Sequence, residues 1–375
     1  MTAAATVGQG PPYREVSDAY ASLAVLKERV DHELVVFART ETALLEAVDP
    51  ELKPVAEQLR AAIAVGKRLR AAFCYWGWLA AGREDSEDMV RASAAMELVH
   101  AAAVVHDDVI DRSGLRHGRP TAHRALIPRG GRGGEEAEST GRALAILLGD
   151  LLISWAGQLF SGCGLPGAYL NRARPLWARL ARELVAGECL EVLRTGTSGD
   201  DPVGADSSLK IIRYKTAKYT VEHPLHIGAL LGGAPPALLE VFSAYGVPLG
   251  EAFQLRDDLL GVFGAPDVTG KSNLDDIAGA RPTVLLALAR QRAGAAERSE
   301  LRALLECPEP GREQLDRFRE IAERTGARRR VEELIAVRGD AAAAAVDAGL
   351  LGGLLPAHAA DALHVLARTA LARAL

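Results

Sequence analysis

Apolar residues recur at three- and four-residue intervals along most of this chain. The pattern is clearest in Val16 to Val48, Leu52 to Ala81 and Asp88 to Asp111. This spacing puts apolar side chains on one face of a helix, whereas the alternating pattern of a strand is scarce. From Asp340 onward the chain is rich in alanine, the residue with the highest helix propensity. We therefore predict an all-α fold.

Glycine, proline and charged residues interrupt the periodic pattern in four places. The interruptions are Pro128 to Thr140, Thr195 to Ser208, Gly264 to Asn273 and Cys307 to Gly311. Each is short enough to be a loop within one domain, and no repeat of solenoid length is present. A length of 375 residues fits one large domain or two modest ones. We predict a disordered tail at 1–15 and a single helical domain at 16–375.

The overall composition is that of an ordinary soluble protein. Hydrophobic residues make up 49% and charged residues 25%, which excludes global disorder and a disulfide scaffold. Lysine and arginine total 44 against 49 acidic residues, a net charge of -5, so no nucleic-acid partner is expected. The four cysteines lie far apart without metal-ligand spacing, as expected for reduced thiols in the cytoplasm.

No segment has the pattern of a leader or of an uninterrupted membrane span. The first residues, MTAAATVGQGPP, lack the basic start and apolar centre of a signal peptide. The best candidate span, ALAILLGDLLISWAGQLF, is broken by Asp150. We expect a cytoplasmic protein without an integral membrane segment.

Two aspartate-rich segments occur 150 residues apart. HDDVID contains Asp107, Asp108 and Asp111, and QLRDDLLG contains Asp257 and Asp258. On a helix, residues i and i+4 share a face, and carboxylates gathered there repel one another unless a cation compensates them. Mg²⁺ prefers oxygen ligands and commonly joins protein carboxylates to substrate phosphates. A lone motif of this kind is more often a solvated acidic helix end, but the pair predicts a magnesium site.

Basic segments accompany the acidic ones. They are GKRLR with Lys67, Arg68 and Arg70, RHGRPT with Arg116 and His117, KTAKYT with Lys215, and TGKS with Lys271. Each alone could be an ordinary surface charge. In combination with two acidic motifs they suit a polyanion held between metal ions and cations.

The order of these motifs resembles a known family. GKRLR, ELVH, HDDVID, RHGRPT, GDLL, KTAKYT, FQLRDD and the GK of Lys271 follow one another as in the trans-isoprenyl diphosphate synthases, the polyprenyl synthetase family. The resemblance covers Gly66 to Thr283. It implies an isoprenoid-synthase-type helical bundle around a deep central cavity, usually homodimeric. Family members join isopentenyl diphosphate to an allylic diphosphate with the help of Mg²⁺.

The resemblance also assigns roles to individual residues. It implies that three Mg²⁺ ions per active site are bound by aspartates of both motifs, namely Asp107, Asp108, Asp111, Asp257 and Asp258. The allylic diphosphate would be bound by Arg116, Lys215 and Lys271, and isopentenyl diphosphate by Lys67, Arg70, His100 and His117. Thr216 and Gln254 would line the reacting centre. The growing chain would run past Ala102 and Ala103, where shorter-chain family members often have an aromatic ring, although two alanines could also merely permit close helix packing.

Some positions depart from the family pattern. The second acidic motif lacks its usual third aspartate, which is Gly261 here, and His117 stands where arginine is usual. The usual Gly-Gln pair reads Gly187 and Glu188, and the late Gly-Lys pair reads Ala280 and Arg281. These changes affect the expected strength of binding more than the reaction class.

Several other residues have simpler interpretations. Glu191 either assists the metal site or caps a polar patch. Structural roles are expected for the remaining polar or aromatic candidates, which are His106, His123, His223, His226, Trp76 and Trp78.

The predicted function is chain elongation with geranylgeranyl diphosphate as the main product, because KTAKYTVEHPL and DDLLGVFG most resemble bacterial geranylgeranyl diphosphate synthases. Longer polyprenyl diphosphates are the first alternative. A regulatory subunit of a heteromeric synthase would explain Gly261 but should have lost more ligands. A class I terpene cyclase would need a later Asn/Asp-rich triad, which neither Asn171 nor Asn273 opens.

Overall fold

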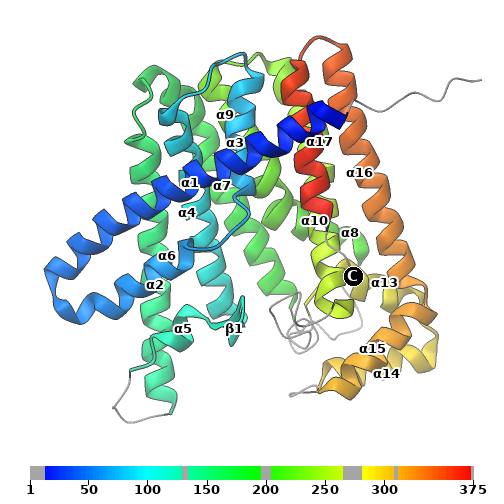
Figure 1. The fold of residues 1–375 in the computed structure, drawn as a ribbon. Helices are drawn as coiled ribbons and strands as arrows, with labels where there is room; N and C mark the ends of the chain where they lie inside the picture. Colours follow the sequence, from blue (N-terminus) through cyan, green and yellow to red (C-terminus); the bar gives the residue numbers. More distant parts are fainter. Residues whose placement is uncertain (1–12, 129–133, 196–203, 265–280, 308–310, 373–375) are drawn as a thin grey trace, which may run out of the picture.

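The structure, a computed structural model, describes residues 13–128, 134–195, 204–264, 281–307 and 311–372. Helices account for nearly all regular structure in these ranges, which confirms the all-α prediction (Figure 1). In the first half they are α1 (Tyr13–Val48), the short 3₁₀ helix η1 (Pro50–Leu52), α2 (Lys53–Ile63), α3 (Leu69–Ala80), α4 (Glu87–Ile110), α5 (Ala122–Ala125), α6 (Glu135–Ser161) and α7 (Gly167–Arg194).

The second half continues the helical pattern and includes one unusual element. The α-helices are α8 (Ala205–Ile212), α9 (His223–Gly232), α10 (Pro236–Phe263), α13 (Val284–Arg292), α14 (Ala295–Leu305), α15 (Arg312–Arg324), α16 (Ala327–Leu351) and α17 (Ala357–Leu371). Between α8 and α9 the chain forms a π-helix, η2 (Arg213–Glu222). π-helical turns are rare and are frequently found at functional sites.

A small hairpin follows the end of α4. Strands β1 (Leu115–Arg116) and β2 (Arg119–Pro120) pair antiparallel, with Arg116 opposite Arg119. The two turn residues, His117 and Gly118, both have positive φ, as a tight two-residue hairpin turn requires. The hairpin therefore reverses the chain directly beside the acidic end of α4.

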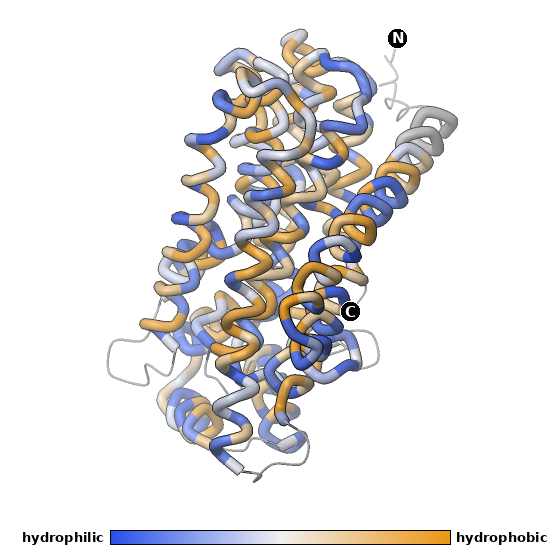
Figure 2. The backbone as a smooth tube through the Cα atoms, turned by 90° about the vertical axis from the view of Figure 1, so that its left-hand side faces the viewer, coloured by the Kyte–Doolittle hydropathy of each residue, from blue (hydrophilic) through white to orange (hydrophobic). Residues whose placement is uncertain are grey.

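The helices bury their apolar faces in two clusters. The larger one is built from α1, α3, α4, α6, α7, α9, α10 and α17, and α1 lies across α17, α3 and α4. The smaller one joins the C-terminal part of α10 to α13, α14, α15 and α16. Figure 2 shows apolar and polar residues alternating along individual helices, as expected where each helix buries one face. Since α10 contributes to both clusters, it connects them; the single-domain boundaries remain a prediction.

The sequence pattern missed one helix boundary. The apolar periodicity from Leu52 to Ala81 continues through the GKRLR segment, but α2 ends at Ile63 and α3 begins at Leu69. Arg68 lies between them in the left-handed region, with φ of 55°. Its buried guanidinium donates to the Ile63 carbonyl and to Asp31. Hydrogen bonds made by this one arginine hold a turn that hydrophobic spacing cannot reveal.

One helix has the length and composition of a membrane span. It is α6, which contains the apolar run interrupted by Asp150. Its inner face packs on α4, and Leu148, Leu152 and Trp155 are buried there. A core helix of a globular protein meets the same criteria, so this single helix is weak evidence for a membrane span.

Helices α3 and α9 approach each other closely because of two glycines. A Cβ atom at Gly228 would lie 1.8 Å from the Cys74 carbonyl oxygen, and one at Gly77 would lie 2.2 Å from that of Leu225. The neighbouring Trp76 and Trp78 are buried, as predicted. This contact sets the position of α9 and of the π-helix that precedes it.

We predict that Gly228→Ala destabilises the protein by about 1 to 3 kcal/mol, because the added methyl group forces α3 and α9 apart. Gly157→Ala is the matched control, since a Cβ in that helical position meets no atom within 4 Å. Chemical unfolding of both variants measures the difference. Equal stability of the two variants would contradict the close-packing argument.

Candidate active site

The first acidic motif lies on the last turn of α4, at the end of a buried helix. Asp108 is buried, whereas Asp107 and Asp111 are partly exposed and share one side of the helix. The His106 Nε2 atom lies 3.1 Å from the Ile146 carbonyl oxygen of α6. A Cβ at Gly149 would collide with this imidazole, so the glycine of GDLL makes room for it. His106 is therefore a structural residue, as predicted.

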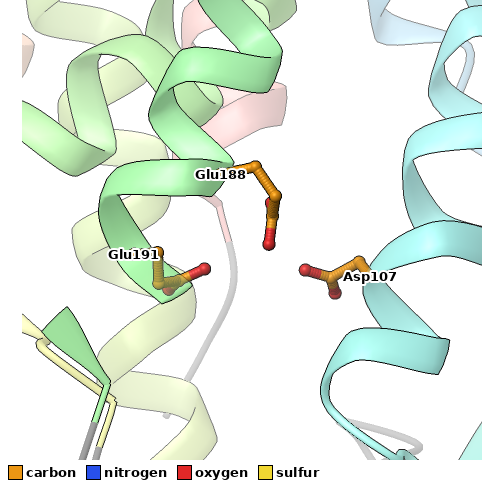
Figure 3. A group of neighbouring side chains, drawn as sticks. All are labelled: Asp107, Glu188 and Glu191. Atoms are coloured by element: carbon orange, nitrogen blue, oxygen red, sulfur yellow. The ribbon is translucent and has the colours of Figure 1, made fainter. Parts of the chain in front are cut away.

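Lys215 on the π-helix joins α4 to α7. Its Nζ atom lies 2.7 Å from Asp107 Oδ1 and 3.0 Å from Glu188 Oε2, and it also donates to Glu191. Figure 3 shows the three carboxylates converging from the two helices. Their oxygens lie within 4.8 Å of one another, close enough to ligate one metal ion. The cluster is thus an acidic site with an ammonium at its centre.

The charges in this cluster strongly perturb one another. Burial alone would lower the pKa of Lys215, but the surrounding carboxylates hold it well above its usual value. Burial would raise the pKa of Asp107, yet Lys215 and Arg281 keep it well below the usual range. Burial raises the pKa of Glu188, and its acidic neighbours act in the same direction. Lys215 therefore stays protonated and Asp107 stays ionised at neutral pH.

Two arginines pair with the other aspartates of the motif. Arg116, on β1, donates to Asp108 through two nitrogens and lies 3.5 Å from Asp107 Oδ2. Arg281 forms an ion pair with Asp111. Burial and the nearby Asp107 charge nevertheless raise the pKa of Asp111 to about 7, although Arg281 opposes the shift. Every aspartate of the first motif therefore faces a cation from another segment.

The π-helix brings polar groups from α10 beside this cluster. Thr216 donates to Gln254 Oε1 at 2.9 Å, and the Gln254 amide donates to Asp258 at 2.8 Å. The two backbones approach closely, because a Cβ at Gly250 would lie 2.4 Å from Ala217 Cα. On the other side, a Cβ at Gly187 would lie 2.3 Å from the Lys215 backbone nitrogen. Both glycines let α7 and α10 hold the π-helix between them.

A second basic group lies farther along the π-helix. The buried Arg70 guanidinium stacks 4.5 Å from the centre of the Tyr219 ring and donates to the Tyr219 hydroxyl at 2.8 Å. It also donates to Thr220, and His100 Nδ1 lies 3.2 Å from the same tyrosine hydroxyl. Burial, together with Arg70 and Arg116, holds the pKa of His100 well below its usual value. His100 is therefore a neutral imidazole beside a fixed cation.

A family model described as polyprenyl synthetase matches residues 52–323. The chain belongs to this family. A (2E,6E)-farnesyl diphosphate synthase of Mycobacterium bovis is 33% identical over 58% of this chain, and the match spans 55% of that relative's length. A geranylgeranyl diphosphate synthase of Mycobacterium tuberculosis is 34% identical over 68% of this chain and 66% of its own.

Solved structures of this family have the same fold. A geranylgeranyl pyrophosphate synthase from Corynebacterium glutamicum, complexed with isoprenyl diphosphate and magnesium, superposes with a TM-score of 0.85 at 32% identity. The match covers 93% of this chain and 99% of that one. A polyprenyl synthase from Caulobacter crescentus, complexed with calcium and isoprenyl diphosphate, has a TM-score of 0.73 at 29% identity and covers 98% and 99%.

The polyprenyl synthetase fold brings many of the predicted site residues together. Asp107, Asp108, Arg116 and Lys215 form one ion-pair network, and Thr216, Gln254 and Asp258 form a hydrogen-bonded chain beside it. Arg70 and His100 share the Tyr219 hydroxyl.

Other predicted residues lie at the edges of the site. Lys67 and His117 are exposed, and Asp257 is partly buried on α10. Lys271 lies outside the described residues. Ala102 and Ala103 lie on α4 just before the acidic motif, Ala102 fully buried and Ala103 partly exposed.

Some contacts of this site were not foreseen. Glu191, which the sequence analysis singled out, lies beside Asp107, but its pairing with Glu188 was missed. The two glutamates are three residues apart on α7, so their spacing could have indicated a shared face. The Arg281–Asp111 pair and the Tyr219 contacts join segments 170 and 149 residues apart, which spacing cannot predict. Three other histidines have structural contacts, as expected: His123 with Thr121, His226 with the Leu239 carbonyl, and His223 with the carboxylate of Glu183, a partner that the sequence did not suggest.

Proposed function

We propose that this protein is a Mg²⁺-dependent prenyltransferase that condenses isopentenyl diphosphate with allylic diphosphates. The observation that carries the proposal is the cluster at the end of α4, where carboxylates face cations from three other segments. Such an arrangement fits a substrate that is both metal-bound and highly anionic. Family membership supports the same activity.

The carboxylates suit magnesium. We propose that Asp107, Asp108 and Asp111, with Asp257 and Asp258 on α10, hold the ions, of which three are expected. Asp107 offers oxygens within ligand distance of a common point with Glu188 and Glu191. Bound Mg²⁺ would neutralise the diphosphate and make it a better leaving group.

The cations would receive the allylic diphosphate. Arg116 and Lys215, together with Lys271, would donate hydrogen bonds to its oxygens and stabilise the charge that grows as the carbon–oxygen bond breaks. Thr216 and Gln254 would face the reacting carbon with polar oxygens. The released diphosphate would then accept the proton lost on condensation.

Isopentenyl diphosphate would bind beside the second basic group. Arg70 is held by Tyr219 and Thr220, so its guanidinium is fixed before the ligand arrives. Lys67 and His117 are exposed, and we expect their side chains to reach the phosphates. The neutral His100 imidazole would add a hydrogen bond without adding charge.

Geranylgeranyl diphosphate is the main product we propose, with longer polyprenyl diphosphates as the alternative. Relatives of this chain include farnesyl, geranylgeranyl and geranylfarnesyl diphosphate synthases, so the product depends on space for the tail. Ala102 and Ala103 precede Asp107 by about one helical turn, and their small side chains leave room along α4.

We also propose that the protein forms a homodimer through α6 and α7. These consecutive helices expose large apolar side chains, with Leu147 62% exposed and Leu193 74% exposed. Ile146, Ile153 and Val185 extend the same apolar character. Apolar patches of this kind often mark interfaces, and the mass of the protein in solution tests the proposal. The cytoplasmic location stays a prediction.

Activity should depend on Mg²⁺ and on the first acidic motif. Asp107→Ala and Asp111→Ala should each lower kcat on the order of 100-fold or more, because the charge of the leaving diphosphate loses a stabilising group. The measurement is the conversion of labelled isopentenyl diphosphate and an allylic primer into longer products. Wild-type protein that forms no product with Mg²⁺ would contradict the proposed function.

The two diphosphate sites should respond separately to mutation. Lys67→Ala should raise KM for isopentenyl diphosphate about 10- to 100-fold, since a charge-assisted phosphate contact contributes roughly 1.5 to 3 kcal/mol. KM for the allylic primer should change little. Lys53→Ala, at another exposed lysine, is the control. An equal rise in KM for both substrates would contradict the assignment of Lys67 to the isopentenyl diphosphate site.

Larger side chains before Asp107 should shorten the product. A helical turn rises about 5.4 Å, comparable to one isoprene unit, so Ala103→Phe or Ala102→Phe should shift the product toward farnesyl diphosphate. Continued synthesis of shorter products shows that the reacting centre is intact. If both variants fold and still make products of the wild-type length, the growing chain does not pass this part of α4.

A further inference from the structure

The Lys215 ammonium is enclosed by acidic side chains. An ammonium carries three N–H donors, and here three carboxylates surround it, those of Asp107, Glu188 and Glu191. An anionic ligand can therefore accept a hydrogen bond from Lys215 only after one carboxylate moves away. The proposed function assigns Asp107 to the metal, so we expect Asp107 to be the carboxylate that leaves Lys215.

Glu188 and Glu191 remain beside the ammonium when Asp107 turns to the metal. Asp107 has a second cation nearby, since Arg116 lies 3.5 Å away, but Lys215 is the cation that contacts both glutamates. In addition, Glu188 Oε1 is buried without a hydrogen-bond partner in the described part of the chain. Two negative charges thus face one positive charge at the diphosphate site.

We propose that Glu188 is a positioning and charge-tuning residue: it holds Lys215 toward the vacated place of Asp107 and reduces the positive charge that the bound diphosphate meets. This inference rests on the proposed function, because it assigns Lys215 to the diphosphate. The lysine then acts as a directed hydrogen-bond donor rather than as a net cation. Diphosphate is consequently held less tightly and leaves more readily after each condensation.

The geometry supports this role. Figure 3 shows the Glu188 carboxylate facing the gap between α7 and α4, opposite Asp107. Gly187, the preceding residue, lies directly against the backbone of Lys215, which places Glu188 beside the lysine. A glutamine would fill the same space and keep an oxygen toward Lys215, but without the charge.

The test is the affinity for inorganic diphosphate in the presence of Mg²⁺, measured by calorimetry and as inhibition against the allylic substrate. Glu188→Gln should bind diphosphate more tightly, on the order of tenfold, because one nearby negative charge is removed. Glu188→Asp keeps the charge and should stay near the wild type. Weaker or unchanged binding by Glu188→Gln would overturn the proposal, and weaker binding would identify Glu188 as a metal ligand instead.

Two further variants make the result decisive. Glu183→Gln is the matched control, since Glu183 lies on the same helix but contacts Lys218 and His223 rather than Lys215. Its diphosphate affinity should not change. Glu191→Gln removes the same charge from the same ammonium and should also tighten binding, which keeps the test available if Glu188→Gln does not fold. A wild type that binds diphosphate but makes no prenyl product would contradict the proposed function and leave this test intact.

Discussion

The ammonium of Lys215 is the contact on which the site depends. It joins the acidic end of α4 to two glutamates of α7, helices that approach the π-helix from different sides. Removing one partner from a buried ion pair leaves an uncompensated charge and is strongly destabilising. The acidic end of α4 and the two glutamates of α7 are therefore held in place by the same charges that would bind the substrate.

The π-helix explains how one lysine can reach both helices. It lies between α7 and α10, and Gly187 and Gly250 allow both neighbours to approach its backbone closely. Its first residues face the acidic cluster, whereas Tyr219 and Thr220 hold Arg70. One irregular segment thus sets the distance between the two proposed diphosphate sites, and shifting either neighbouring helix would change both.

The sequence predicted the fold class, and it singled out many of the residues that the structure brings together, because both depend on local patterns. Apolar spacing identified the helices, and the acidic motifs identified Asp107 and Asp111 as partners on one helix face. Long-range pairing was not accessible in this way: nothing near Arg281 or Tyr219 indicates that they contact Asp111 and Arg70. The break at Arg68 was also missed, because hydrogen bonds rather than a change in hydrophobic spacing produce it.

The balance of charge around the acidic end of α4 determines what can bind there. The carboxylates of Asp107, Asp108, Asp111, Glu188 and Glu191 face Lys215, Arg116 and Arg281, so negative charge remains in excess among these side chains. Such a site attracts divalent cations and repels a diphosphate that arrives without them. In the proposed function, a metal bound by the aspartates would leave their arginine and lysine partners to the anion. Binding of metal and of diphosphate would then be coupled through the same ion pairs.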